Sequence, residues 1–185
     1  MCGSSSVCQP GFLALFDHIL EVDAERRSEP PRTLSEIWPH LSLAIIAGSP
    51  LATHQKAIEA RAGRPIDFIE TYGASEGLMA FQSELSDPAL LLHLDNGLFY
   101  EFVPVDQLDE PNPRRYTVAD VETDIWYAIY LTTSSGLWSY HVGDTVRFTE
   151  LSPHKILVGG SHQRATRHRV REGPRHRRQG GTARG

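Results

Sequence analysis

The stretch IDFIETYGASEG, residues 66–77, decides the fold predicted for this chain. It opens with alternating and β-branched apolar residues and turns polar and small from Thr71 onward, as a buried strand does when it runs into a tight loop. The small residues of the loop would let a flat ligand approach the backbone, while Tyr72 and Glu76 supply an aromatic ring and a carboxylate. An ordinary glycine turn after a strand is the alternative interpretation.

A second stretch, YHVGD at residues 140–144, repeats the order of aromatic residue, glycine and acid after another predicted strand. One such loop is common in proteins, but two in one chain favour a shared binding site.

Composition limits the class of protein. With 185 residues and 40% hydrophobic content, the chain is long enough for one domain with a real core. Its two cysteines, Cys2 and Cys8, both lie near the start and indicate neither a disulfide framework nor a zinc site. No apolar run approaches the ~20 residues of a membrane span. Residues 12–20 are apolar but contain Asp17 and His18 and lack a basic leader, so no signal peptide is predicted and a cytoplasmic protein is expected.

The first half of the chain has the pattern of an α/β protein. An amphipathic helix is predicted over 12–22, a surface connection over 23–33 and a short helical turn over 34–38. Residues 41–47 form an apolar run typical of a strand buried on both faces. A helix over 54–62, closed by Gly63, leads into the strand at 66. Strand, helix and strand in this order predict a parallel unit whose ligand edge lies at the carboxyl ends of the strands.

The second half is predicted to be mainly antiparallel β. Strands are expected over 78–83, 90–94, 98–105, 124–132, 137–140, 145–151 and 155–158. Asn96-Gly97 predicts a tight hairpin between the strands at 90–94 and 98–105.

Several side chains of this half are interpreted as structural. Those expected to pack the β layer are Phe99, Phe102, Trp126 and Trp138, and those interpreted as hairpin residues rather than a metal cluster are His93, Asp95 and Glu101.

Residues 161–185 differ from everything before them. They carry eight arginines and one glutamate, whereas the first 160 residues carry 10 basic and 22 acidic groups. A disordered basic tail is one interpretation. An arm for nucleic acid is disfavoured because no aromatic residues interleave as stacking platforms. Arg/Gly/His-rich text without a pattern is also what GC-rich DNA yields out of frame, and we favour this interpretation.

Three stretches together resemble the GH3 family of acyl-acid amido synthetases, relatives of the adenylate-forming acyl-CoA synthetases and luciferases. They are TYGASEG (71–77), HLDNGLFYEFVP (93–104) and GLWSYHVGDTVRFT (136–149). The resemblance covers about 12–160 and implies a partial adenylation domain there, after a disordered start at 1–11. The family activates a carboxylic acid with ATP to give an acyl-adenylate, and the amine of an amino acid then displaces AMP to form an amide.

The resemblance implies a site for ATP and Mg²⁺, with carboxylic acid and amino acid substrates. Adenine would lie against Tyr72, Gly73 and Ala74, and Ser75 would lie near the α-phosphate or the acyl group. Glu76 would help to hold Mg²⁺, an ion that prefers oxygen ligands. Asp144 would accept hydrogen bonds from the ribose hydroxyls, with Tyr140 and Gly143 shaping its turn. Without a bound ligand, Asp144 would instead be a solvated acid in a turn, and Glu76 would be a carboxylate at the N-terminus of a helix. No catalytic residue is assigned, and His141 receives no role.

The chain departs from the family pattern in two regions. Relatives carry a Ser/Thr/Gly-rich phosphate loop well upstream of the Tyr-Gly-Ala-Ser-Glu element, and Ser4-Ser5-Ser6 lies too close to that element to replace it. Relatives also continue past the position of Gly160 into a mobile C-terminal domain. The chain therefore resembles an internal part of a larger synthetase, and we expect it to be inactive alone and to expose apolar core surface. The alternatives are a nucleotide- or acyl-binding module that does not catalyse and a basic-tailed nucleic-acid binder.

Overall fold

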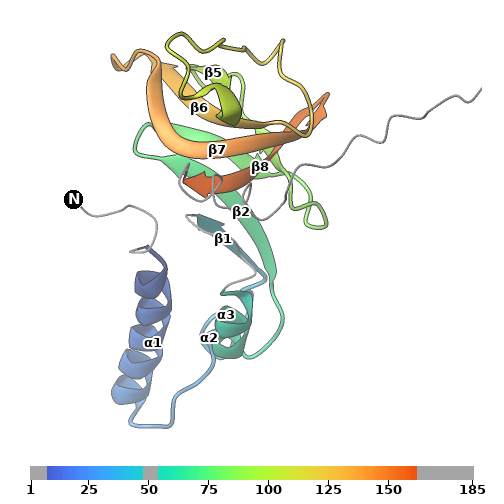
Figure 1. Ribbon diagram of the computed structural model, residues 1–185. Helices are drawn as coiled ribbons and strands as arrows, with labels where there is room; N and C mark the ends of the chain where they lie inside the picture. Colours follow the sequence, from blue (N-terminus) through green and yellow to red (C-terminus); the bar gives the residue numbers. More distant parts are fainter. Residues whose placement is uncertain (1–7, 48–53, 162–185) are drawn as a thin grey trace, which may run out of the picture.

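A computed structural model describes residues 8–47 and 54–161, and its main feature is a mixed eight-stranded sheet with strand order β1-β2-β3-β4-β8-β7-β6-β5. The α-helices gather at the β1 end, and the remaining strands curl away from them (Figure 1). The predicted α/β first half and mainly antiparallel β second half are both confirmed. Residues 161–185, apart from Ser161, lie outside the described part of the chain, and so do residues 1–7.

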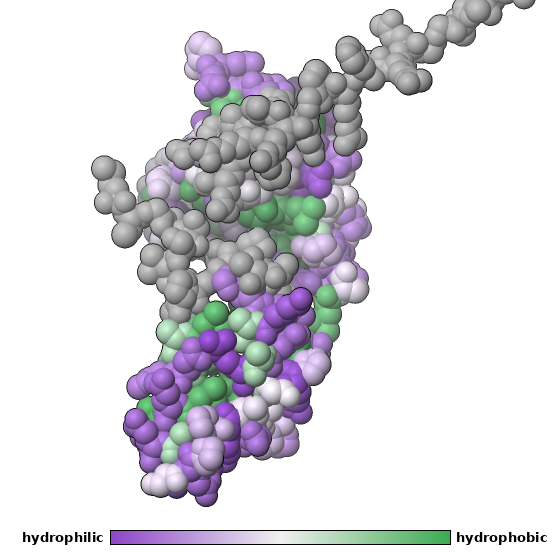
Figure 2. Space-filling model, turned by 60° about the horizontal axis from the view of Figure 1, so that its bottom comes forward, coloured by the Kyte–Doolittle hydropathy of each residue, from purple (hydrophilic) through white to green (hydrophobic). Residues whose placement is uncertain are grey.

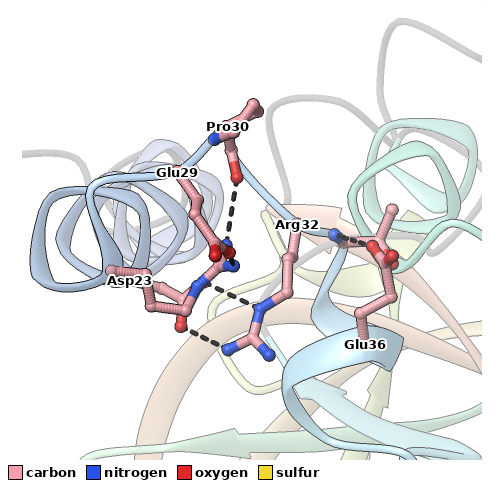
Figure 3. Close-up of polar contacts among 7 residues, drawn as sticks. Asp23, Glu29, Pro30, Arg32 and Glu36 are labelled. Carbon is pink, nitrogen blue, oxygen red and sulfur yellow. Dashed lines mark hydrogen bonds and ion pairs between the residues drawn. The ribbon is translucent and has the colours of Figure 1, made fainter.

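Helix α1 (Cys8–Arg27) is longer than predicted at both ends. Residues 8–11 are helical rather than unstructured, and Asp23 belongs to the helix rather than to a surface connection. The carboxylate of Asp23 accepts hydrogen bonds from Arg27 Nε and Arg32 Nε, both at 3.0 Å. Figure 3 shows Arg32 reaching back to Asp23 from the segment that follows the helix. These guanidinium groups, Arg32 first, hold the pKa of Asp23 below its usual value, so the network favours helix where charge density alone indicated a loop.

The two short helices agree with the prediction. Helix α2 (Leu34–Ile37) begins after Thr33, whose backbone N–H donates to Glu36 Oε2 at 2.6 Å. Helix α3 (Gln55–Ala62) ends at Gly63, which has a φ of 77°. A Cβ at Gly63 would lie 2.5 Å from Thr33 Cγ2, so both the backbone angle and the close approach require glycine there.

Strands β1 (Leu43–Ala47) and β2 (Asp67–Ala74) are parallel with α3 between them, which confirms the predicted parallel unit. The prediction that β1 is buried on both faces is wrong. Leu43 is 40% exposed and Ile45 64% exposed, while Ala44 and Ile46 pack on the small core formed with α3. The apolar run misled because, in the described part of the chain, only the face of β1 that holds Ala44 and Ile46 packs on other elements.

The other strands are β3 (Gly77–Gln82), β4 (Leu90–Leu92), β5 (Leu98–Pro104), β6 (Trp126–Thr133), β7 (Tyr140–Leu151) and β8 (His154–Ser161), with a short 3-10 turn, η2 (Val105–Gln107), after β5. The predicted hairpin at Asn96-Gly97 is wrong, because β4 pairs with β3 and β8 while β5 pairs with β6. Gly97 does have the expected positive φ, 80°, but its loop joins two strands that do not pair.

The strands predicted over 137–140 and 145–151 form one strand, β7, that begins only at Tyr140. Residues 137–139 lie outside it, and Ser139 has a positive φ of 45°. The pattern appeared broken because β7 contains a bulge around Gly143, which has a φ of 95°.

The main core lies inside the curl of the sheet and receives side chains from β2 through β8. Phe102 and Phe148 are fully buried there, with ring centroids 5.1 Å apart in edge-to-face contact. Packing of Phe102 is thus confirmed, and Trp126 is partly buried. Packing is wrong for Phe99 and Trp138, which are 56% and 83% exposed.

The helical face of the molecule is mainly hydrophilic, with hydrophobic residues in separate spots between the helices (Figure 2). In the described part of the chain no helix combines the length and the apolar character that membrane crossing requires.

Candidate functional site

The stretch 71–77 forms a hairpin rather than a strand that ends in a loop. Strand β2 continues through Ala74, the turn consists of Ser75 and Glu76, and β3 begins at Gly77, which pairs with Ala74. Gly73 lies beside a register shift, and Gly73, Ala74 and Ser75 are all exposed. The hairpin therefore presents open backbone at its tip, as the small side chains predicted.

The second motif, residues 140–144, is a β-bulge. Ala128 of β6 pairs with Thr145, whereas Tyr130, two residues further on, pairs with His141, so β7 has extra residues against its partner. Gly143 supplies the positive φ within this bulge. A bulge re-aims the side chains next to it, and here it directs Asp144 toward the inside of the curled sheet.

The two motifs meet through their side chains. The hydroxyl of Tyr72 donates a hydrogen bond to Asp144 Oδ2 at 3.2 Å, across 72 residues of sequence. Strands β2 and β7 are not neighbours, since β3, β4 and β8 lie between them, so the contact exists because the sheet curls. The residue Tyr72 is only 8% exposed and belongs to the main core, so in this structure its hydroxyl, and not an open ring face, is the group at the site.

The electrostatics of Asp144 are set by partial burial. Desolvation raises the pKa of Asp144. The Tyr72 hydroxyl and the His141 imidazole lower this pKa, and the Glu76 carboxylate raises it. Burial first and Asp144 second raise the pKa of Tyr72, so its hydroxyl remains a proton donor. The site therefore holds a half-buried carboxylate that accepts a hydrogen bond from the Tyr72 hydroxyl.

The structure brings Tyr72, Glu76 and Asp144 within electrostatic range of one another. Tyr140, at the start of β7, is 43% exposed. The sequence did not indicate that Tyr72 and Asp144 bond directly, and Gly143, between the strands predicted over 137–140 and 145–151, was the only signal that the acid sits on a bulge.

Glu76 fits the kind of ligand that Mg²⁺ uses with nucleotides. Among residues 8–47 and 54–161 no group of three His, Cys, Asp or Glu side chains gathers as an all-protein metal site. Mg²⁺ commonly takes one or two carboxylates, several waters and substrate phosphates, so the single, partly buried carboxylate of Glu76 in the turn is a suitable donor. His93 Nε2 lies 3.1 Å from Asp95 Oδ1, whereas Glu101 Oε1 lies 3.8 Å from Arg115 Nε. The three residues are therefore engaged in two separate ion-pair contacts.

The chain is similar in sequence to proteins of known family. Residues 91–157 match the family model described as the GH3 family central domain. A probable indole-3-acetic acid-amido synthetase, GH3.11, of Oryza sativa subsp. japonica is 29% identical over 130 residues, which cover 63% of this chain and 22% of that protein.

Solved structures agree in fold. A GH3.15 acyl acid amido synthetase in complex with 2,4-DB superposes with a TM-score of 0.56 at 24% identity, over 69% of this chain and 22% of that one. Another structure of GH3.15 acyl acid amido synthetase gives a TM-score of 0.54 at 24% identity, over 70% of this chain and 23% of that one. The chain thus spans about a fifth of the length of these relatives. The match of residues 91–157 to the central domain and the similarity to the curated relative show that this chain resembles GH3 amido synthetases in sequence, and the two solved structures show that it shares part of their fold.

Proposed function

We propose that this chain supplies the adenosine-binding part of an ATP-dependent ligase that joins a carboxylic acid to an amino acid. The observation that carries the proposal is the hydrogen bond between Tyr72 and Asp144, which unites the two sequence motifs at one place beside Glu76. A half-buried carboxylate next to an open glycine-rich hairpin offers a nucleoside both acceptors and backbone access.

Each residue has a definite task in this proposal. Asp144 accepts hydrogen bonds from the ribose hydroxyls, and the Tyr72 hydroxyl holds its carboxylate in place. The exposed backbone of Gly73 and Ala74 lies against adenine, because neither residue carries a side chain beyond Cβ. The Ser75 hydroxyl, at the hairpin tip, faces the α-phosphate or the carboxyl group to be activated.

Glu76 would hold Mg²⁺ together with the phosphates of ATP. The ion neutralises phosphate charge and so makes pyrophosphate a better leaving group. Tyr140 borders the nucleotide at the other side of the bulge.

The complete reaction belongs to the proposal as well. Attack of the acid's carboxylate oxygen on the α-phosphorus forms the acyl–phosphate bond and releases pyrophosphate; attack of the amine on the acyl carbon then forms the amide and releases AMP. Because the chain spans about a fifth of its relatives, we expect the chain by itself to bind nucleotide in the cytoplasm without completing this sequence.

Nucleotide binding tests the proposal. AMP titration by calorimetry is expected to show binding to the wild-type chain and a loss of about tenfold or more for Asp144→Asn, the loss expected when charge-assisted hydrogen bonds disappear. Asp109→Asn, which removes a carboxylate from an exposed loop, is the matched control and should bind as the wild type does. Equal affinity of Asp144→Asn and wild type would refute the proposed role.

A binding module that does not catalyse is the second candidate. It predicts the same AMP affinity and, as the first candidate does for the chain by itself, no exchange of labelled pyrophosphate into ATP when the purified chain is supplied with a panel of aryl and alkyl carboxylic acids. Exchange that depends on an acid would establish adenylation by the chain itself and would contradict the expectation that it is inactive alone.

A further inference from the structure

Residues 93–97, which join β4 to β5, and Leu98, the first residue of β5, are held against the beginning of β3. The backbone N–H of His93 donates to Met79 O at 2.9 Å, and the side-chain amide of Asn96 donates from Nδ2 to Leu78 O at 2.7 Å. The Tyr100 hydroxyl donates to His93 O at 2.9 Å. This segment, which we call the latch (residues 93–98), is therefore tied to the two residues that follow Gly77.

Both ends of the Asn96 amide are used. While Nδ2 bonds Leu78 O, Oδ1 accepts from the backbone N–H of Leu98 at 3.2 Å. The positive φ of Gly97 allows the chain to turn between these two contacts. An aspartate at this position would keep the second contact but would set an oxygen against Leu78 O, because a carboxylate has no donor.

The latch also touches the glycine beside Glu76. A Cβ at Gly77 would lie 3.0 Å from Leu98 Cδ1, so the Leu98 side chain rests close to the first residue of β3. The turn of Ser75 and Glu76 is thus fixed on its β3 side by Leu98 at Gly77 and by Asn96 at Leu78.

We propose that Asn96 is a positioning residue, which holds the β2–β3 turn so that Glu76 stands where the metal and phosphates of ATP bind. This inference rests on the proposed function, because it assigns to Asn96 an effect on the nucleotide that acts through Glu76. Asn96 itself touches protein groups only, and Asp144 holds the nucleoside from the other side of the site.

The test uses ATP affinity of the full chain, measured by calorimetry with Mg²⁺ and with EDTA, and adenosine affinity alongside. In the wild type Mg²⁺ should raise the ATP affinity. In Asn96→Asp and Asn96→Ala that gain should shrink by about fivefold, the effect of one lost hydrogen bond, while adenosine binds within twofold of wild type. Asn112→Asp places the same added charge on an exposed loop and should keep the full gain.

The other outcomes are separable. If the wild type binds ATP with a Mg²⁺-dependent gain and both Asn96 variants keep it, the inference is overturned and the proposed function stands. If the variants lose ATP and adenosine affinity equally, Asn96 supports the fold in general and the inference is again wrong. If the wild type shows no Mg²⁺-dependent gain, the proposed role of Glu76 fails, and the role of Asn96 fails with it.

Discussion

Replacing Tyr72 by phenylalanine removes one oxygen from the interior and tests the contact that unites the two motifs. The hydrogen bond to Asp144 joins a nearly buried hydroxyl to a half-buried carboxylate, and its length of 3.2 Å is long for an O–H···O bond. Bonds to charged groups contribute about 1.5–3 kcal/mol, but the length of this one and the access of water to Asp144 reduce the expected loss to about 1 kcal/mol.

The pH dependence has a definite sign. Because the folded pKa of Asp144 is raised above its unfolded value of 3.8, the folded state binds this proton first as pH falls. Asp144 therefore lowers stability at neutral pH, and the loss is relieved as pH falls through the folded pKa. Tyr72→Phe removes the hydrogen bond that lowers this pKa. It should therefore raise the pKa of Asp144 further and increase the loss of stability at neutral pH.

Urea denaturation followed by tryptophan fluorescence measures the stability, and carboxyl ¹³C NMR titration measures the pKa of Asp144. A double-mutant cycle of Tyr72→Phe with Asp144→Asn isolates the pair. Tyr116→Phe, which removes the hydroxyl of a partly buried tyrosine elsewhere on the core, should leave the pKa of Asp144 unchanged. An unchanged pKa in Tyr72→Phe, together with no coupling in the cycle, would show that the contact does not exist in solution.

Three further predictions concern the scaffold. Gly63→Ala should destabilise the chain by about 1–3 kcal/mol more than Gly136→Ala in urea titrations, because both glycines have positive φ but a Cβ at Gly136 meets no atom within 4 Å; equal losses would contradict the crowding at Gly63. We expect the chain to self-associate through the exposed apolar face of β1, so Ile45→Lys, which places a charge on that face, should reduce the self-association measured by sedimentation velocity; a lysine variant that associates as the wild type does would contradict this. Lys155 lies 2.8 Å from Asp87 and holds the pKa of that carboxyl below 3.8, so the pair stabilises the fold above this pH and the stability is lost as pH falls through the lowered pKa. Lys155→Met should therefore make the stability less dependent on pH in acid, as urea titrations at pH 7 and pH 3 would show; an unaltered acid dependence would exclude the pair as its source.

Local patterns predicted the elements that depend on near neighbours. The helix closed by Gly63 and the parallel unit of β1 and β2 follow from periodicity and from the stop signal of a glycine. Pairing of β4 with β8 could not be predicted, because the Asn-Gly signal concerns only the residues beside it, and the choice of partner depends on which strands the curled sheet brings together. Exposure of Ile45 was missed because an apolar run does not show whether other elements cover one face of a strand or both.

The α/β order of the first half, the β character of the second half and the resemblance to the GH3 family could all be read from the sequence, because they depend on local periodicity and on short motifs. Only the tertiary structure decided that 71–77 is a hairpin tip, that 140–144 is a bulge and that Tyr72 bonds Asp144. The physical reason is curvature. Side chains 72 residues apart meet because a sheet with a buried inner face curls until its apolar side chains pack together, and that closure is a property of all its strands at once.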